Sequence, residues 1–265
     1  MNLSMSYKLN SSTYHPFEYG RMSSSIQNNT SQKMLVTKVC INFDWMESEF
    51  FSEGCNIEIA PRSKVDLPEI SFEIGLDASI GTHEYKAGVS YKLFKEKGWH
   101  LQSGDTGDVT WCRGSQHLMV VKSPSRDFEI FISHSNEPKD AILLRQTIDS
   151  FENCGIQPYV AELVPEPGER LWEKIQAAVR KADAILILWT QAGSKSGDIR
   201  EEIGLAIGAK RTKRIIPLVE SGLMTQGSLI GLEHVPLDLD KPIKALSIAL
   251  SRAINWADRR NKVKT

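Results

Sequence analysis

The run ADAILILWT (Ala182–Thr190) decides the fold of the C-terminal half of this 265-residue chain. Its six consecutive apolar residues, Ala184–Trp189, leave no polar face on a strand. A strand that is apolar on both sides is typical of the centre of a parallel sheet, where helices cover both faces. We therefore expect strands and helices to alternate around this run.

Strand-like and helix-like segments do alternate from Asp127 onward, with helical stripes recognised by their 3.6-residue period. Pro138 opens the first expected helix, and Gly155 ends it. Five such units predict an α/β domain with a five-stranded parallel, doubly wound sheet of the flavodoxin-like type. The expected strands are DFEIFISHS, IQPYVA, DAILILWT, RIIPLVE and HVPLDL, and the expected apolar stripes are Ala141, Leu144, Ile148 and Phe151, then Leu171, Ile175, Ala178, Val179 and Ala182, with PIKALSIALSRAINWA as the final helix.

The N-terminal half has a different sequence pattern, in which short runs of alternating apolar and polar residues are broken by Gly, Pro and Asp. In EISFEIGL, Ile70, Phe72 and Ile74 alternate with polar residues, and SGDTGD is an expected turn. Such runs predict a small β-rich domain, a sandwich or partial barrel. The expected organisation is a flexible arm (1–33), the β-rich domain (34–122), a linker (123–126), the α/β domain (127–258) and a tail (259–265).

Charge and cysteine content exclude several classes of function. The net charge of −1 gives no general attraction to nucleic acid or to an anionic membrane. The four cysteines form no CxxC pair, so we expect reduced thiols, no metal site and a cytoplasmic protein. The longest apolar run is far short of the ~20 residues that span a bilayer.

The expected sheet also predicts where a ligand would bind. In open parallel sheets, ligands bind beyond the carboxyl ends of the strands. Three segments follow those ends: 133–138, 162–170, and the stretch from Thr190 into the next helix. The chain contains neither GxGxxG after the first strand nor GxxxxGK[ST] nor GxSxG, which disfavours standard dinucleotide, P-loop and α/β-hydrolase chemistry.

The helix expected in SGDIREEIGLAIGAK (196–210) carries two adjacent glutamates, with Ser196 as its N-cap. At 100° per residue, Ile199, Ile203, Ala206 and Ile207 form the apolar stripe. Glu201 falls almost opposite that stripe, whereas Glu202 falls at its edge. We therefore expect Glu202 to be partly desolvated and Glu201 to be solvated; a boundary salt bridge is the other reading of Glu202.

These segments together resemble a TIR (Toll/interleukin-1 receptor) domain of the prokaryotic defence type. DFEIFISHS and ADAILILWT are similar to the first and third strands, and the loop with PEPGER is similar to the loop after the second strand. SGDIREEIGLAIGAK is similar to the family's helix motif Ser-x-Trp-(Val/Ile)-x-x-Glu-Ile-x-x-Ala, in which Glu202 matches the catalytic glutamate.

The resemblance implies an NAD+ glycohydrolase that releases nicotinamide and ADP-ribose in antiphage or immune signalling, with NAD+ as substrate and no resident cofactor or metal. A non-catalytic interaction scaffold and a synthase of a cyclic ADP-ribose-type signal remain alternatives. Ser133, His134, Ser135 and Asn136 would contribute to the nucleotide site, although Ser135 or Asn136 could instead cap the next helix.

The helix departs from the family's motif at one position. Asp198 stands where the family often has tryptophan, and it is the remaining candidate for substrate contact. An aromatic side chain near the ribose or nicotinamide would be lost at this position, and Trp172 or Trp189 could replace it. Asp198 could also be only a first-turn residue favoured by the helix dipole.

The expected partners follow from the same resemblance. TIR enzymes become active on self-association, so we expect a dimer or a ligand-triggered filament, with no membrane or nucleic acid. The N-terminal domain would regulate the enzyme, through a small-molecule activator or through assembly. Trp99, His100 and Trp111 could line a binding face there, or pack in the core.

Overall fold

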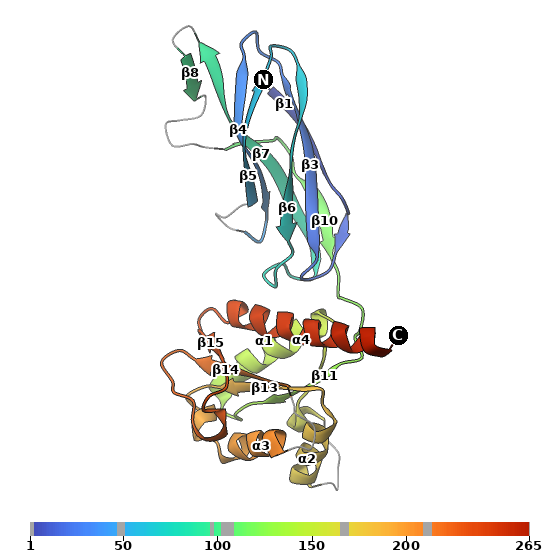
Figure 1. Ribbon diagram of the computed structural model, residues 1–265, viewed down its shortest axis with the longest axis vertical. Coiled ribbons are helices and arrows are strands. Elements are labelled where there is room, and N and C mark those ends of the chain that lie inside the picture. Colours follow the sequence, from blue (N-terminus) through green and yellow to red (C-terminus); the bar gives the residue numbers. More distant parts are fainter. Residues whose placement is uncertain are drawn as a thin grey trace. The chain divides into compact units, whose positions relative to one another are not determined.

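The computed structural model describes residues 3–46, 51–95, 98–101, 109–164, 170–208 and 214–264. The chain divides into two units, Met1–Val121 and Lys122–Thr265. Each unit contains its own hydrophobic core and is drawn in Figure 1. The expected turn SGDTGD and the side chains of Trp99 and His100 lie outside the described residues.

The C-terminal unit is built on a five-stranded sheet in the order β12-β11-β13-β14-β15. All four neighbouring pairs are parallel, which confirms the predicted flavodoxin-like sheet. The chain enters this sheet at β11, next to one edge, forms that edge with β12, and then crosses to the central strand β13 and on to the other edge. The strands are β11 (Glu129–Ser133), β12 (Gln157–Tyr159), β13 (Ala184–Trp189), β14 (Arg214–Glu220) and β15 (Val235–Leu237).

Helices cover both faces of this sheet, with α1 and α4 on one face and α2 and α3 on the other (Figure 1). Short 3-10 turns lie in the connections. The helices are α1 (Ala141–Asn153), α2 (Leu171–Lys181), α3 (Gly197–Gly208) and α4 (Ile243–Lys264), and the 3-10 turns are η1 (Pro138–Asp140), η2 (Ala161–Leu163), η3 (Gly193–Lys195) and η4 (Gly227–Leu229).

Strand β13 lies at the centre of the unit. Every residue from Ala184 to Trp189 is buried. Ile185 pairs with Phe131 on one side and with Ile215 on the other. The continuous apolar run is thus the direct consequence of a position with strands on both edges and helices on both faces.

Three predicted details of this unit are wrong. The described residues between β14 and β15 form no α-helix, only the turn η4, so the fourth unit lacks its helix. The expected tail at 259–265 is part of α4, which continues to Lys264. Leu171 belongs to no buried stripe, because it starts α2 with half of its surface exposed.

The buried face of α1 also differs from the predicted stripe. Ala141 is exposed, whereas Leu143, Thr147 and Phe151 are buried. Thr147 can be buried because its hydroxyl donates a 2.7 Å hydrogen bond to the Leu143 carbonyl. A stripe traced through apolar residues alone misses such a residue. Gly155 ends the helix as predicted, with a φ of 73°.

The N-terminal unit consists of two sheets that pack around a single core. One sheet has the order β1-β3-β6, and the other has the order β2-β10-β7-β4-β5, with β8 and β9 also paired to β7. Inward-facing side chains of both sheets meet in the core: Phe43 and Phe72 lie 4.9 Å apart between ring centroids. The strands are β1 (Leu3–Leu9), β2 (Thr13–Tyr14), β3 (Tyr19–Asn28), β4 (Met34–Phe43), β5 (Phe51–Ile59), β6 (Lys64–Glu73), β7 (Gly81–Lys95), β8 (Gly98–Leu101), β9 (Thr110–Trp111) and β10 (Gln116–Val120).

The predicted flexible arm at 1–33 is wrong, because residues 3–28 contribute three strands to these sheets. Met22 and Ile26 are fully buried. Asn28 is also fully buried, and its side-chain amide donates to the carbonyls of Gln32, Ile59 and Ala60. Polar residues whose hydrogen bonds are satisfied within the unit can be buried at little cost.

Candidate functional site

The described parts of the three segments predicted to surround a ligand lie at one edge of the parallel sheet, whereas residues 165–169 of the loop with PEPGER lie outside the described residues. Ser133 is the last residue of β11, Glu162 lies in η2 directly after β12, and Thr190 directly follows β13. Since β12, β11 and β13 are consecutive neighbours in the sheet, their carboxyl ends lie side by side.

Helix α3 brings Glu202 to this edge. Ser196 precedes the helix and accepts a hydrogen bond from the Ile199 amide, as expected of an N-cap. Glu201 is exposed, and Glu202 is only 5% exposed. The predicted difference between the two glutamates is therefore confirmed.

Glu202 lies deeper than predicted because the buried face of α3 is rotated toward it. The buried residues are Ile199, Glu202, Ile203 and Ala206, whereas Ile207, expected in the stripe, is 49% exposed. Glu202 thus lies within the buried face of the helix. The burial of a charged carboxyl group costs free energy unless the charge is paired or the group becomes neutral.

The burial of Glu202 changes its acidity. Desolvation raises the pKa of its carboxyl to about 7; the Ser133 hydroxyl acts against this shift, and the negative charges of Glu162 and Asp198 add to it. At neutral pH the group is therefore divided between its acid and carboxylate forms. Side chains with such perturbed acidity are concentrated at functional sites.

Two polar atoms at this edge are buried and make no hydrogen bond within the described residues. They are Glu202 Oε2 and Ser133 Oγ. Ser133 is near enough to the carboxyl group of Glu202 to lower its pKa. Buried polar atoms nearly always have hydrogen-bond partners. Two such atoms without partners at the carboxyl ends of the strands therefore favour a bound ligand that supplies the missing hydrogen bonds.

A buried carboxylate, Asp140, fastens two of the loops at this edge to each other. Its Oδ2 accepts hydrogen bonds from Ser135 Oγ at 2.5 Å and from Thr190 Oγ1 at 2.6 Å. Thr190 Oγ1 in turn accepts the Gly193 amide at 3.0 Å. Asp140 therefore joins the loop after β11 to the segment that leads into α3.

We predict that Asp140→Ala lowers the free energy of unfolding of the C-terminal unit by roughly 2–4 kcal/mol, because two buried hydroxyls lose their acceptor. Asp140→Asn retains one oxygen in the same place and should cost clearly less. Urea unfolding of the full chain would measure both variants. Equal stability of Asp140→Ala and the wild type would show that this network contributes nothing to the fold.

The other predicted site residues occupy different positions at the edge. His134 is half-buried, and Asn136 and Asp198 are exposed. Ser135 accepts a hydrogen bond from the Glu137 amide at 3.4 Å and, through Asp140, holds its loop in place. Neither Ser135 nor Asn136 is the N-cap of the following turn, where Glu137 stands.

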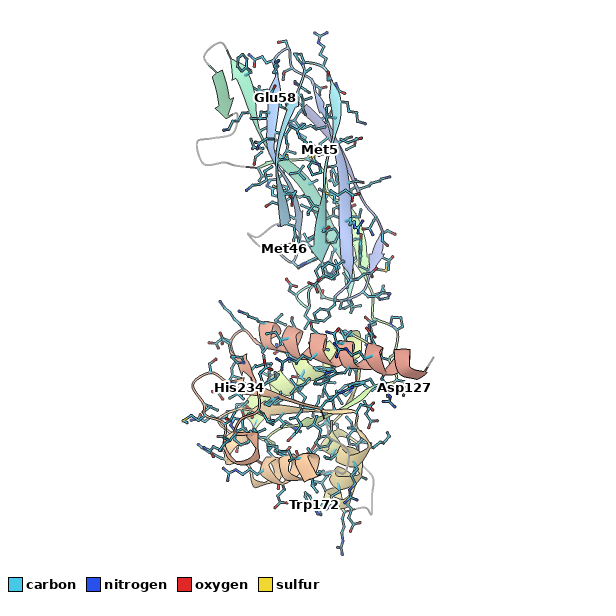
Figure 2. All side chains as sticks on the ribbon, in the orientation of Figure 1. Met5, Met46, Glu58, Asp127, Trp172 and His234 are labelled. Carbon is cyan, nitrogen blue, oxygen red and sulfur yellow. The ribbon has the colours of Figure 1, made fainter. Side chains whose placement is uncertain are left out.

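The two tryptophans considered as replacements for the missing aromatic residue have different surroundings. Trp189 is fully buried at the end of β13, and its indole N–H donates to the Met224 carbonyl at 3.4 Å. Trp172 projects from α2 (Figure 2) and lines a cavity of about 430 Å³ together with Glu201. Asp198, in the position where tryptophan was expected, is exposed.

Lys174 was not predicted as part of this site. It is 8% exposed on α2, and its Nζ donates to the Ala161 carbonyl at 2.8 Å. This bond holds η2, and with it Glu162, against the helix. The only sign of this burial in the sequence is that Lys174 lies beside the predicted apolar stripe of α2, one residue before Ile175. The described residues contain no cluster of three His, Cys, Asp or Glu side chains that could hold a metal ion.

The fold and this edge together define an open parallel α/β domain with two buried carboxyl groups, Asp140 and Glu202, at the carboxyl ends of its strands. Residues 130–260 match the family model of the TIR domain. The C-terminal half of the chain is a TIR domain.

The chain is also similar to a solved TIR domain and to a solved SEFIR domain. The TIR domain of the Toll-related receptor TRR-2 from Hydra magnipapillata is 17% identical, with a TM-score of 0.39 over 49% of this chain and 99% of that one. A prokaryotic SEFIR domain is 12% identical, with a TM-score of 0.37 over the same shares. No curated protein matches the chain. Among the described residues, no helix is long and apolar enough to cross a membrane.

Proposed function

We propose that the TIR domain cleaves the nicotinamide–ribosyl bond of NAD+ and releases nicotinamide and ADP-ribose. The observation that carries this proposal is the carboxyl of Glu202. It is buried at the carboxyl edge of the sheet, its pKa is raised to about 7, and its Oε2 has no partner among the described residues.

The reaction suits a single carboxylate. The C1′–N bond breaks with its electron pair passing to the nicotinamide ring nitrogen, which is cationic before cleavage and needs no general acid. The ribose becomes oxocarbenium-like, and a carboxylate facing it stabilises the developing positive charge. Water then bonds to C1′ and gives up a proton, which the Glu202 carboxylate can accept.

The neighbouring residues have distinct roles in this proposal. The Ser133 hydroxyl, which has no hydrogen-bond partner among the described residues, can bond to a ribose hydroxyl beside Glu202. Ser135 holds its loop through Asp140. His134 and Asn136 lie on the same loop, and Asp198 is exposed one turn before Glu202 on α3. No resident cofactor or metal is required.

Activity should depend on pH with the acidity of Glu202. Only the carboxylate form stabilises the cation, so kcat/KM should level off above about pH 7 and fall roughly tenfold for each pH unit below it. Bound NAD+ places a positive charge beside the carboxylate and lowers its pKa. The acid limb of kcat should therefore lie at lower pH than that of kcat/KM.

Asp198→Asn provides a directional check on this assignment. The charge of Asp198 raises the pKa of Glu202, so its removal should move the acid limb of kcat/KM to lower pH. Glu201→Gln is the matched control, because the exposed Glu201 does not contribute to this shift. If the acid limb of kcat/KM moves equally in both variants, or in neither, a group other than Glu202 controls the pH dependence.

Incubation of the full chain with NAD+, with products resolved by mass, tests the reaction itself. ADP-ribose and a cyclic product differ by one water, because in the cyclic product an adenine nitrogen replaces water at C1′. ADP-ribose is the expected product. The exposed Asp198 in the tryptophan position favours the second candidate, a scaffold that forms neither product.

Self-association fits the same proposal. TIR domains commonly self-associate, and a carboxyl that is 5% exposed needs a rearrangement before NAD+ can reach it. We therefore propose a dimer or filament as the active form, controlled by the N-terminal unit in an immune or antiphage response.

A further inference from the structure

The sandwich of the N-terminal unit has an opening on one side. Strand β10 pairs with β7 only from Gly81 to Tyr85. Farther along β7, its partner is the two-residue strand β9, which pairs with Gly88 and Val89. Between β9 and β10 the chain turns through Gly114, which has a φ of 82°. The edge of this sheet is therefore interrupted.

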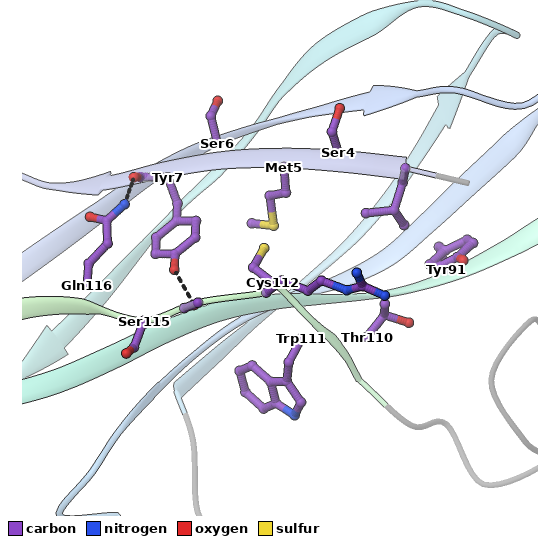
Figure 3. Close-up of a pocket in the computed structure, with 13 residues that line it drawn as sticks. Ser4, Met5, Ser6, Tyr7, Tyr91, Thr110, Trp111, Cys112, Ser115 and Gln116 are labelled. Carbon is purple, nitrogen blue, oxygen red and sulfur yellow. Dashed lines mark hydrogen bonds between the residues drawn. The ribbon is translucent and has the colours of Figure 1, made fainter. Parts of the chain in front are cut away.

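Strand β1, the edge of the other sheet, lies across this interruption. Its inward side chains Leu3, Met5 and Tyr7 pack against the core but remain half-buried. Two hydrogen bonds join the facing edges: Tyr7 Oη donates to the Gly114 carbonyl at 3.4 Å, and Gln116 Nε2 donates to the Tyr7 carbonyl at 3.2 Å. These bonds close the opening at one end, as Figure 3 shows.

The remaining space is a cavity of about 640 Å³. This volume lies within the range of about 300–1,000 Å³ that is typical of small-molecule sites. In Figure 3, Met5 and Cys112 point toward each other across it, whereas Ser4 and Ser6 point away. The described residues that line it include Leu3, Met5, Tyr7, Tyr91, Cys112 and Arg113.

The lining gives the cavity a definite chemistry. Tyr91 is 6% exposed, and burial raises the pKa of its hydroxyl. Arg113 is exposed and has no ion-pair partner among them. None of the described lining residues is acidic. The cavity thus combines the apolar side chains of β1 and a mostly buried tyrosine with polar neighbours and one positive charge at its rim.

We propose that this cavity binds a small amphipathic organic anion. Its apolar or aromatic body would lie between Met5, Tyr7 and Tyr91, where it would cover half-buried apolar side chains. A polar atom of the body would pair with the Tyr91 hydroxyl. Its carboxylate, sulfonate or phosphate would lie against the Arg113 guanidinium, which favours such groups. The proposal is independent of the chemistry at Glu202.

Two fluorescent probes test the site on the full chain. Anilinonaphthalene sulfonate has an aromatic body and one anionic group, and phenylnaphthylamine has the same body without the charge. The wild type should bind both saturably. Met5→Trp fills the slot and should weaken both probes by at least about tenfold, since it removes the space for the body. Lys8→Trp places the same side chain on the outward face of β1, at an exposed residue that does not line this cavity, and should leave both affinities unchanged.

Arg113→Gln tests the charge. It should weaken the sulfonate probe by roughly tenfold, the loss of one charge-assisted contact, and leave the neutral probe unchanged. Because Arg113 is exposed, this variant keeps the test valid if Met5→Trp fails to fold, which thermal melting would reveal. Non-saturable binding by the wild type would overturn the proposal. So would equal weakening by Met5→Trp and Lys8→Trp, or an Arg113→Gln effect that is the same for both probes.

Discussion

Replacement of Glu202 by glutamine is expected to slow nicotinamide release from NAD+ by at least about a thousandfold, the loss typical when a group that stabilises transition-state charge is removed from a water-poor site. Glutamine has nearly the same shape as glutamate and can still donate to and accept from the ribose hydroxyls. The developing cation, however, then faces a neutral group. The 5% exposure of Glu202 makes the effect large, because little water is present to replace the lost charge.

Glu201→Gln is the matched control for this experiment, because it makes the same chemical change one residue earlier on the exposed face of α3. Its rate should stay within about twofold of the wild type, as expected for a solvated surface carboxylate. Steady-state rates with saturating NAD+ would measure both. Similar losses in both variants would indicate a general effect of charge on the helix and would remove Glu202 from its assigned role.

The same substitution is expected to stabilise the folded protein in alkaline solution. The pKa of Glu202 is about 7 in the folded chain and 4.5 for an ordinary glutamate. Below the ordinary value the group is protonated in both the folded and the unfolded state, so its burial as a charge costs nothing. As pH rises through the folded pKa that stability is lost, up to about 3 kcal/mol at 1.36 kcal/mol per pKa unit.

Glutamine remains neutral at every pH, so Glu202→Gln avoids this loss. Its unfolding free energy should exceed that of the wild type by about 3 kcal/mol at pH 8 and by less than about 1 kcal/mol at pH 5. Calorimetry of the full chain would follow the transition that Asp140→Ala also shifts, which identifies the C-terminal unit. A gain that does not change with pH would mean that Glu202 carries no burial cost as a charge.

Much of the C-terminal unit could be predicted from the sequence because its strands are continuous apolar runs. Ala184–Trp189 can be buried on both faces only at the centre of a parallel sheet, and the remaining strands then follow in order. The carboxyl edge of that sheet, with Ser133 and the start of α3, follows from the same topology. The contrast between Glu201 and Glu202 follows from helical geometry.

The depth of the site could not be predicted in this way. A helical wheel weighs apolar residues, so it counted Ile207 in the buried stripe and left Glu202 at its edge. The burial of Asp140 and Thr147 was not predicted for the same reason, since both are polar residues whose hydrogen bonds form only in the folded chain. Long-range partners such as Thr190 for Asp140 have no signal in local sequence.

The first strands of the N-terminal unit were not predicted because of the amino-acid composition of residues 1–33. Leu3, Met5, Tyr7 and Leu9 alternate with polar residues along β1, a two-residue period that is visible in the sequence. The abundance of serine and asparagine around them nevertheless pointed to an arm. On β3, Asn28 is buried because three backbone carbonyls accept its amide hydrogens, and composition cannot reveal such partners.

The central claim is that the TIR domain consumes NAD+ through Glu202, and the most direct test is nicotinamide release by the wild-type full chain and by Glu202→Gln over a range of protein concentrations. We predict release by the wild type that rises more steeply than in proportion to concentration, as self-association forms the active state, and none by the variant. No release by the wild type at any concentration, or equal release by the two proteins, would contradict the account.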